Sequence, residues 1–192
     1  MAYQTYTTEA LVCGTQNRNT ADRSYLLFTR DAGMVFADAR SVREERSRQR
    51  YALQDFSLVR VSLVKGKRGW KIGSIESLKN FYHDAADKTA RGSVVSVFRH
   101  LRRFVRGEEP AEDLFTFTTD ALIELATSPN HTPFTLLVVQ VRILSLLGYV
   151  DDKSVPESIQ HVEPKAIAAR YEPSVEKRVE ALYTHAVSVS HL

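Results

Sequence analysis

Residues 56–76, FSLVRVSLVKGKRGWKIGSIE, carry the clearest secondary-structure signal in the chain. Apolar residues alternate with other side chains around Val59, Val61 and Leu63, which is the period of a half-buried β-strand. Residues 65–69 contain two glycines and connect this segment to a second strand-like segment over residues 70–76. The stretch therefore predicts a β-hairpin with a glycine-containing loop.

Three further strand-like segments precede this hairpin. They cover residues 6–13, 23–29 and 34–39, and the polar residues 14–22 separate the first two as a loop. Gly33 supplies the left-handed position of the tight turn between the other two. Five short strands with turn signals between them predict a small closed barrel rather than a sandwich.

Beyond residue 77 the apolar period changes from 2 to about 3.6, which is typical of helices. Helices are predicted over residues 93–106, 111–127 and 133–147, and around 175–186. The third is apolar on nearly all sides, so we expect it at the centre of a bundle. The predicted fold class is therefore α+β, with a five-stranded barrel domain over residues 1–79 and a helical domain over residues 80–192.

Basic residues are concentrated between positions 40 and 71. Ten Lys or Arg residues stand against Glu44, Glu45 and Asp55, which is a local excess of +7. Such an excess on the loops of a small barrel suits the binding of a polyanion such as nucleic acid. The ten predicted nucleic-acid-binding residues are Arg40, Arg43, Arg46, Arg48, Arg50, Arg60, Lys65, Lys67, Arg68 and Lys71. A merely solvated charged surface is the other interpretation of this run.

The rest of the composition is ordinary. Residues 1–79 hold 14 basic and 8 acidic residues, and residues 80–192 hold 12 and 15, so the halves suggest different partners. Cys13 is the only cysteine, it lies in an apolar strand pattern, and it is expected to be a buried thiol. No signal peptide or membrane span is evident, so a cytoplasmic protein is expected.

Several segments resemble, in order and with similar spacing, the bacterial RecO family of recombination mediators. They are residues 9–12 (EALV), 21–23 (ADR), 26–30 (LLFTR), Gly33, 53–58 (LQDFSL) and 146–149 (LLGY). The resemblance implies an oligonucleotide-binding (OB) fold barrel followed by a helical bundle. The four-cysteine zinc module that follows the Leu-Gly-Tyr segment in many members is absent from this sequence.

The resemblance also implies a function in DNA repair and recombination. It implies binding of single- and double-stranded DNA, strand annealing, and help in loading a recombinase on DNA coated with single-strand-binding protein. The implied partners are RecR and the acidic C-terminal tail of single-strand-binding protein, and the implied place is the nucleoid. A basic face on the predicted helix 93–106 could receive that tail, or it could simply be solvated. Its residues are Arg99, Arg102, Arg103 and Arg106.

Aromatic side chains are a further candidate signal, since binders of single strands stack bases on them. Tyr51 and Trp70 are the leading candidates for stacking, ahead of Tyr25 and Phe56. By apolar alternation, Phe28, Phe36 and Phe56 fit the barrel core better.

The search for catalytic motifs is negative. The histidines are scattered, and no zinc-protease, nucleophile-elbow, P-loop or dinucleotide pattern is present. We therefore expect no enzyme activity, no metal and no cofactor. Two alternatives stay open: an OB-fold RNA- or DNA-binding protein of another pathway, and an adaptor whose barrel binds peptide.

Overall fold

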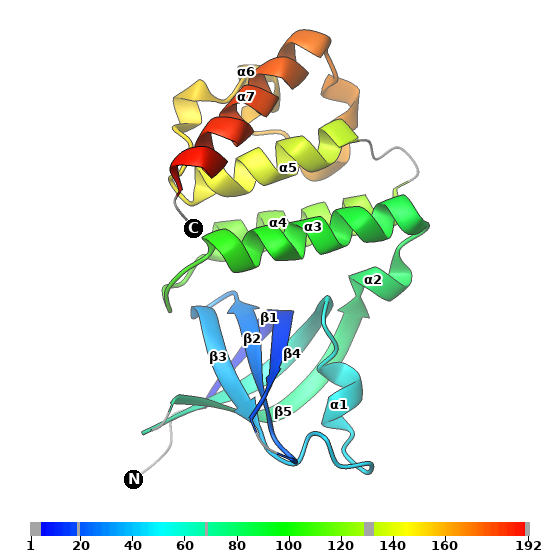
Figure 1. The fold of residues 1–192 in the computed structure, drawn as a ribbon, viewed down its shortest axis with the longest axis vertical. Helices are drawn as coiled ribbons and strands as arrows, with labels where there is room; N and C mark the ends of the chain where they lie inside the picture. The colour runs from blue at the N-terminus through cyan, green and yellow to red at the C-terminus, as the bar shows by residue number, and fades with distance from the viewer. Residues whose placement is uncertain (1–4, 19, 68, 129–132, 191–192) are drawn as a thin grey trace. The chain divides into compact units, whose positions relative to one another are not determined.

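The computed structural model describes residues 5–18, 20–67, 69–128 and 133–190. The chain divides into two compact units. The first extends to Asp84 and also includes Val105–Glu112, and the second contains Ala85–Phe104 and the chain from Asp113 onward. Figure 1 shows the strands of the first unit and the helices of the second.

The first unit is a closed five-stranded barrel, so the predicted barrel followed by helices is confirmed. Its strand order is β1-β2-β3-β5-β4, and every neighbouring pair is antiparallel except β3 with β5. The strands are β1 (Thr5–Asn17), β2 (Arg23–Thr29), β3 (Gly33–Ala39), β4 (Ser57–Gly66) and β5 (Gly69–Asn80). Two short helices, α1 (Gln49–Ala52) and α2 (Phe81–Asp84), complete the unit.

The interior of the barrel is filled by the inward side chains of all five strands. Tyr25, Leu27, Val59 and Val61 are completely buried there, and Trp70 is 7% exposed. Small residues on β3 accompany them, because a barrel of this size leaves little room once two large aromatic rings are inside. Two aromatic stacking candidates from the sequence, Tyr25 and Trp70, are therefore core residues.

The predicted positions of two phenylalanines are wrong. Phe36 lies on the outer face of β3 and is 58% exposed, while its neighbours Val35 and Ala37 point inward. Phe56 is half-buried at a left-handed backbone position (φ 70°) and stacks on Tyr82 at 5.4 Å between ring centroids. Apolar alternation identifies a strand but does not say which of its two faces is inside.

A segment far along the sequence packs on the turn between β2 and β3. The backbone N–H of Met34 donates to Gly107 O at 2.9 Å, and that of Ala111 donates to Arg30 O. Gly33 sits in this contact with φ 62°, and a Cβ there would lie 2.8 Å from Gly107 O. The predicted glycine turn therefore has a second role, since it leaves room for Val105–Glu112.

The second unit is helical. Its main helices are α3 (Lys88–Phe104), α4 (Glu112–Thr127), α5 (Pro133–Leu146) and α7 (Pro173–Val189). Between α5 and α7 lie the short helix α6 (Glu157–Gln160) and three 3₁₀ turns. α3 starts five residues earlier than predicted and ends at Phe104, so Arg106 lies outside the helix.

The helix α5 is buried along most of its length, as its apolar composition predicts. Thr135, Gln140 and Arg142 are polar residues buried with it. Arg142 donates to Ile159 O at 3.0 Å, and Gln140 donates from its side chain to Ser96 Oγ at 3.2 Å. On α3, His100 is 4% exposed and lies with Nε2 3.2 Å from Gln140 O, beside the rings of Phe104 and Tyr183. Burial lowers the pKa of His100 to about 4.

Replacing Gly33 with alanine will destabilise the protein by at least about 3 kcal/mol, because left-handed strain adds to a backbone clash. Gly107 is the matched control, since its φ is 84° but nothing lies within 4 Å of the position that a Cβ would take. Gly107→Ala should cost only about 1–2 kcal/mol. Equal losses for both variants in urea denaturation would contradict the packing described for Gly33.

Stability will fall between about pH 6.5 and 4 because of His100. Its pKa is about 4 when folded and near 6.5 when unfolded, so the unfolded chain binds the extra proton. The contribution lost by pH 4 is about 3 kcal/mol. His100→Gln should flatten the pH dependence of the free energy of unfolding, and an unchanged dependence in this variant would contradict the role given to His100.

Candidate nucleic-acid interface

The two ends of the basic run, Arg40 and Lys71, lie at the junction of β3 and β5. These strands pair in parallel, with Ala37 opposite Trp70 and Asp38 opposite Lys71. Arg40 follows directly after β3, so it lies near Lys71 although 31 positions separate them in the sequence. Closure of the barrel thus brings Arg40 and Lys71 to one surface.

Arg40 and Lys71 line a hollow of about 540 Å³ at this junction. Its lining residues come from β3 and the residue after it, and from α1, β4 and β5: Asp38, Arg40, Gln49, Val64, Gly66, Lys71 and Ile72. The side-chain amide of Gln49 donates to Gly73 O at 2.8 Å, which holds α1 against β5. We call this hollow the β3–β5 hollow.

Four of the ten predicted cations are available to a ligand. Within the described part of the chain, Arg40, Arg48, Lys67 and Lys71 form no ion pair and no side-chain hydrogen bond. Arg40, Arg48 and Lys67 are exposed and Lys71 is half-exposed. Unpaired, hydrated cations of this kind are suited to phosphate groups.

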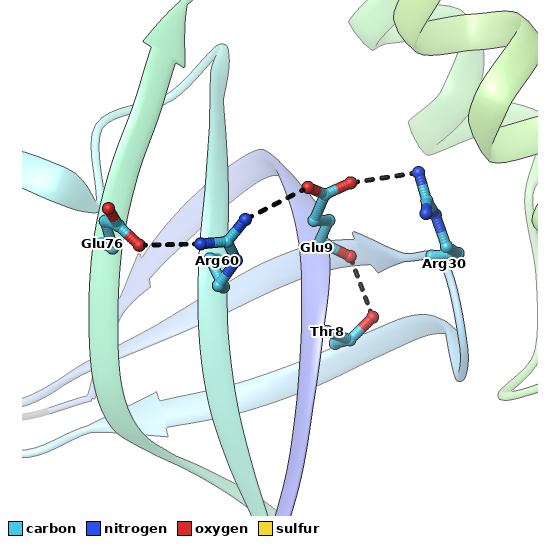
Figure 2. A network of polar contacts seen from close by, with 5 residues as sticks. All are labelled: Thr8, Glu9, Arg30, Arg60 and Glu76. Carbon is cyan, nitrogen blue, oxygen red and sulfur yellow. Dashed lines mark hydrogen bonds and ion pairs between the residues drawn. The ribbon is translucent and has the colours of Figure 1, made fainter.

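Arg60, in contrast, is held by carboxylates on the outer face of β1, β4 and β5 (Figure 2). Its guanidinium lies 3.2 Å from Glu76 and 3.9 Å from Glu9, and Glu9 also pairs with Arg30 at 3.0 Å. The hydroxyl of Thr8 donates to the backbone carbonyl of Glu9 at 3.2 Å. Two basic and two acidic side chains therefore alternate across this face, which lowers its attraction for phosphate.

Two more predicted cations have acidic partners. Lys65 lies 3.0 Å from Glu108 and 4.7 Å above the ring of Trp70, and the ammonium holds the pKa of the Glu108 carboxyl below its usual range. Arg46 lies 3.4 Å from Glu44, although its side chain is 91% exposed. Exposed pairs of this kind contribute at most about 1 kcal/mol, so a phosphate could replace either carboxylate.

The remaining predicted cations differ in their surroundings. The Arg50 guanidinium donates to Tyr51 Oη at 2.6 Å and lies 4.7 Å from the centroid of that ring. Arg43 is exposed, and its backbone N–H donates to Ala21 O at 3.0 Å. Arg68 lies outside the described residues.

A second hollow, of about 460 Å³, lies beside Arg50 and Tyr51 of α1. Its lining includes Arg23 from β2, Thr15 from β1, and the pair Arg50 and Tyr51. Tyr51 is 62% exposed, so it is the most accessible of the four stacking candidates from the sequence. A cation and an open aromatic ring are thus adjacent at this edge of the barrel.

The predicted basic face of the helical unit is smaller than expected. Arg99 and Arg102 are exposed on α3. Arg103 is half-buried, because it donates to Val187 O at 3.4 Å and to Ser190 Oγ at 3.5 Å. Arg106 follows the end of the helix and belongs to the barrel unit. The four arginines therefore do not form one face, since α3 ends before Arg106.

The helical unit also has an acidic hollow of about 460 Å³. Asp120 and Glu124 on α4 line it with Glu163, Lys165 and the 40%-exposed Ile123. Lys165 pairs with Glu163 at 2.7 Å, so the remaining charge is negative. An acidic peptide would be repelled there.

In the described ranges, no helix has the length and apolarity needed to cross a membrane. The same residues contain no group of three or more His, Cys, Asp or Glu side chains arranged to hold a metal ion.

Comparison with known proteins confirms the resemblance stated from the sequence. Residues 1–81 match the family described as Recombination protein O N terminal. The chain is 28% identical over 145 residues to the DNA repair protein RecO of Caldanaerobacter subterraneus, covering 74% of this chain and 58% of the relative. For the protein of the same name from Desulfitobacterium hafniense, identity is 29% over 144 residues, covering 75% and 52%. The chain thus spans little more than half the length of these relatives.

Proposed function

We propose that this chain, a relative of the RecO proteins, binds DNA through its barrel and acts as a non-enzymatic mediator of recombinational DNA repair. The observation that supports this most is that Arg40 and Lys71, which have no ion-pair partner among the described residues, both line the β3–β5 hollow. The repair pathway itself comes from the similarity to proteins named DNA repair protein RecO.

The proposed mechanism is electrostatic. Arg40, Arg48, Lys67 and Lys71 hold the phosphates of one strand, and the counterions released from the DNA supply much of the affinity. Neutralising one strand in this way lowers its repulsion of a complementary strand, which favours annealing. Phosphate contacts carry no base identity, so single- and double-stranded DNA of any sequence are ligands.

The proposed partners are RecR and the acidic tail of single-strand-binding protein, and the proposed outcome is loading of a recombinase on coated DNA. The exposed Arg99 and Arg102 on α3 are the charges best suited to the tail, because Arg103 already binds the end of α7. Association with the nucleoid would follow from DNA binding.

Arg40→Ala combined with Lys71→Ala will weaken binding to every oligonucleotide sequence alike. Each lost phosphate contact should reduce the slope of log affinity against log salt by about 0.7 on single strands. Arg60→Ala is the matched control and should change the slope little, because Glu9 and Glu76 already neutralise that guanidinium. Fluorescence anisotropy at several salt concentrations measures both. A flat salt response of the unaltered protein would favour a peptide-binding adaptor.

A synthetic acidic tail peptide will bind the protein, and Arg99→Ala with Arg102→Ala will weaken that binding several-fold. Arg106→Ala should have no effect, since this residue lies outside α3. Titration calorimetry at low salt measures the affinities. Equal binding to both variants would remove α3 from the proposed contact without affecting DNA binding by the barrel.

A further inference from the structure

A carboxylate from a distant part of the chain is paired with one of the cations of the barrel. Glu108 lies 43 positions after Lys65, and its carboxylate accepts from the Lys65 ammonium at 3.0 Å. The side chains of Lys65 and Glu108 are 56% and 48% exposed, so a ligand can reach the pair. Lys65 lies between Val64 and Gly66, which both line the β3–β5 hollow. A strand held in that hollow would therefore pass beside a cation that already has a partner.

The chain around Glu108 is fixed to the barrel on both sides of this residue. The carbonyl of Gly107 accepts from the backbone N–H of Met34 at 2.9 Å. The backbone of Glu109 packs on Gly33, where a Cβ would lie 2.9 Å from Glu109 N. These contacts do not involve the carboxylate, so they hold it beside the ammonium group whether or not the ion pair is formed.

This anchoring distinguishes the pair from an ordinary pair on the surface. An ion pair between two freely moving side chains is weak, because pairing must order both of them. Arg46 with Glu44 is of that kind, since both lie in one loop and the Arg46 side chain is 91% exposed. The segment Val105–Glu112 instead keeps the effective concentration of the Glu108 carboxylate high at the barrel. The hydrogen bond from Lys65 also lowers the pKa of Glu108, so this carboxyl stays charged at neutral pH.

We propose that Val105–Glu112 is an autoinhibitory segment, in which Glu108 takes the place of a DNA phosphate on Lys65. A carboxylate and a phosphate make the same kind of charge-assisted hydrogen bond to an ammonium group, so they compete for it. DNA gains Lys65 only by displacing Glu108, and the affinity of the barrel is therefore lower than its cations alone would give. The inference rests on the proposed function and adds a restraint to it, because a mediator that passes a strand on must also release it.

The test is a double-mutant cycle on the full chain with Glu108→Gln and Lys65→Ala. Glu108→Gln keeps the size of the side chain and removes its charge, so it should raise the affinity for a labelled single strand about three- to fivefold. When Lys65→Ala is also present, Glu108→Gln should change the affinity less than about 1.5-fold. Fluorescence anisotropy at low salt measures all four proteins.

Glu109→Gln is the matched control for net charge. It removes the same charge one residue further along the segment, where the side chain is exposed and forms no ion pair within the described chain. The affinity should change less than about 1.5-fold. An equal rise with Glu109→Gln, or a rise with Glu108→Gln that persists in the presence of Lys65→Ala, would overturn the inference, because either result would reflect net charge alone.

Trp70 supplies a second measurement. It is the only tryptophan of the chain, and the Lys65 ammonium lies 4.7 Å from the centroid of its ring. Binding of the strand should change the emission of Trp70 in the unaltered protein, as Lys65 moves from Glu108 to a phosphate, and should change it less in Lys65→Ala. Unchanged emission on binding would overturn the inference, while a salt-dependent affinity would leave the proposed phosphate binding intact. Failure of both the unaltered protein and Glu108→Gln to bind any strand would reject the proposed function and this inference together.

Discussion

The parallel pairing of β3 with β5 is the constraint on which the candidate interface depends. All other neighbouring strands of the barrel are antiparallel, and β3 and β5 can meet only when the sheet closes. Only two residue pairs join them, Ala37 with Trp70 and Asp38 with Lys71. Because Trp70 belongs to the core while Lys71 faces outward, burial of one ring fixes the position of the adjacent ammonium group.

Ion pairing then divides the basic residues into two groups. On the outer face of β1, β4 and β5, Arg60 lies between two carboxylates, so its charge stabilises the protein surface locally. Near the β3–β5 hollow, Arg40 and Lys71 have no such partners among the described residues. The net charge of the run therefore overstates the number of cations available to a phosphate. The position of each carboxylate determines which cations remain available.

Much of the fold could be predicted from the sequence, because alternation, glycine turns and the change of period are local signals. β2 was predicted with its observed bounds, and the burial of α5 followed from its composition. The orientation of β3 could not be predicted. Its two faces carry apolar residues of similar character, and the small ones point inward because Tyr25 and Trp70 already fill the interior. That property depends on the closed barrel and not on the strand itself.

Only the excess of basic residues between positions 40 and 71 could be predicted for the candidate site. The sequence indicated where cations are concentrated, but Glu9 and Glu108, which neutralise two of them, are distant in the chain. The end of α3 at Phe104 likewise removed Arg106 from a face that helical spacing alone would include. The outward position of Phe36 could have been considered from the sequence. When both faces of a strand contain apolar residues, either face can point outward.

The strands of the barrel all lie within Thr5–Asn80, but Val105–Glu112 returns to them, so the compact unit that contains the barrel is not one continuous piece of chain. The family match ends at residue 81, and a fragment that ends there contains all five strands of the barrel. Such a fragment would lack the carbonyl that accepts from Met34 and the amide that donates to Arg30 O. It would also uncover the backbone around Gly33, so an exposed strand edge and aggregation are the expected properties of the excised piece.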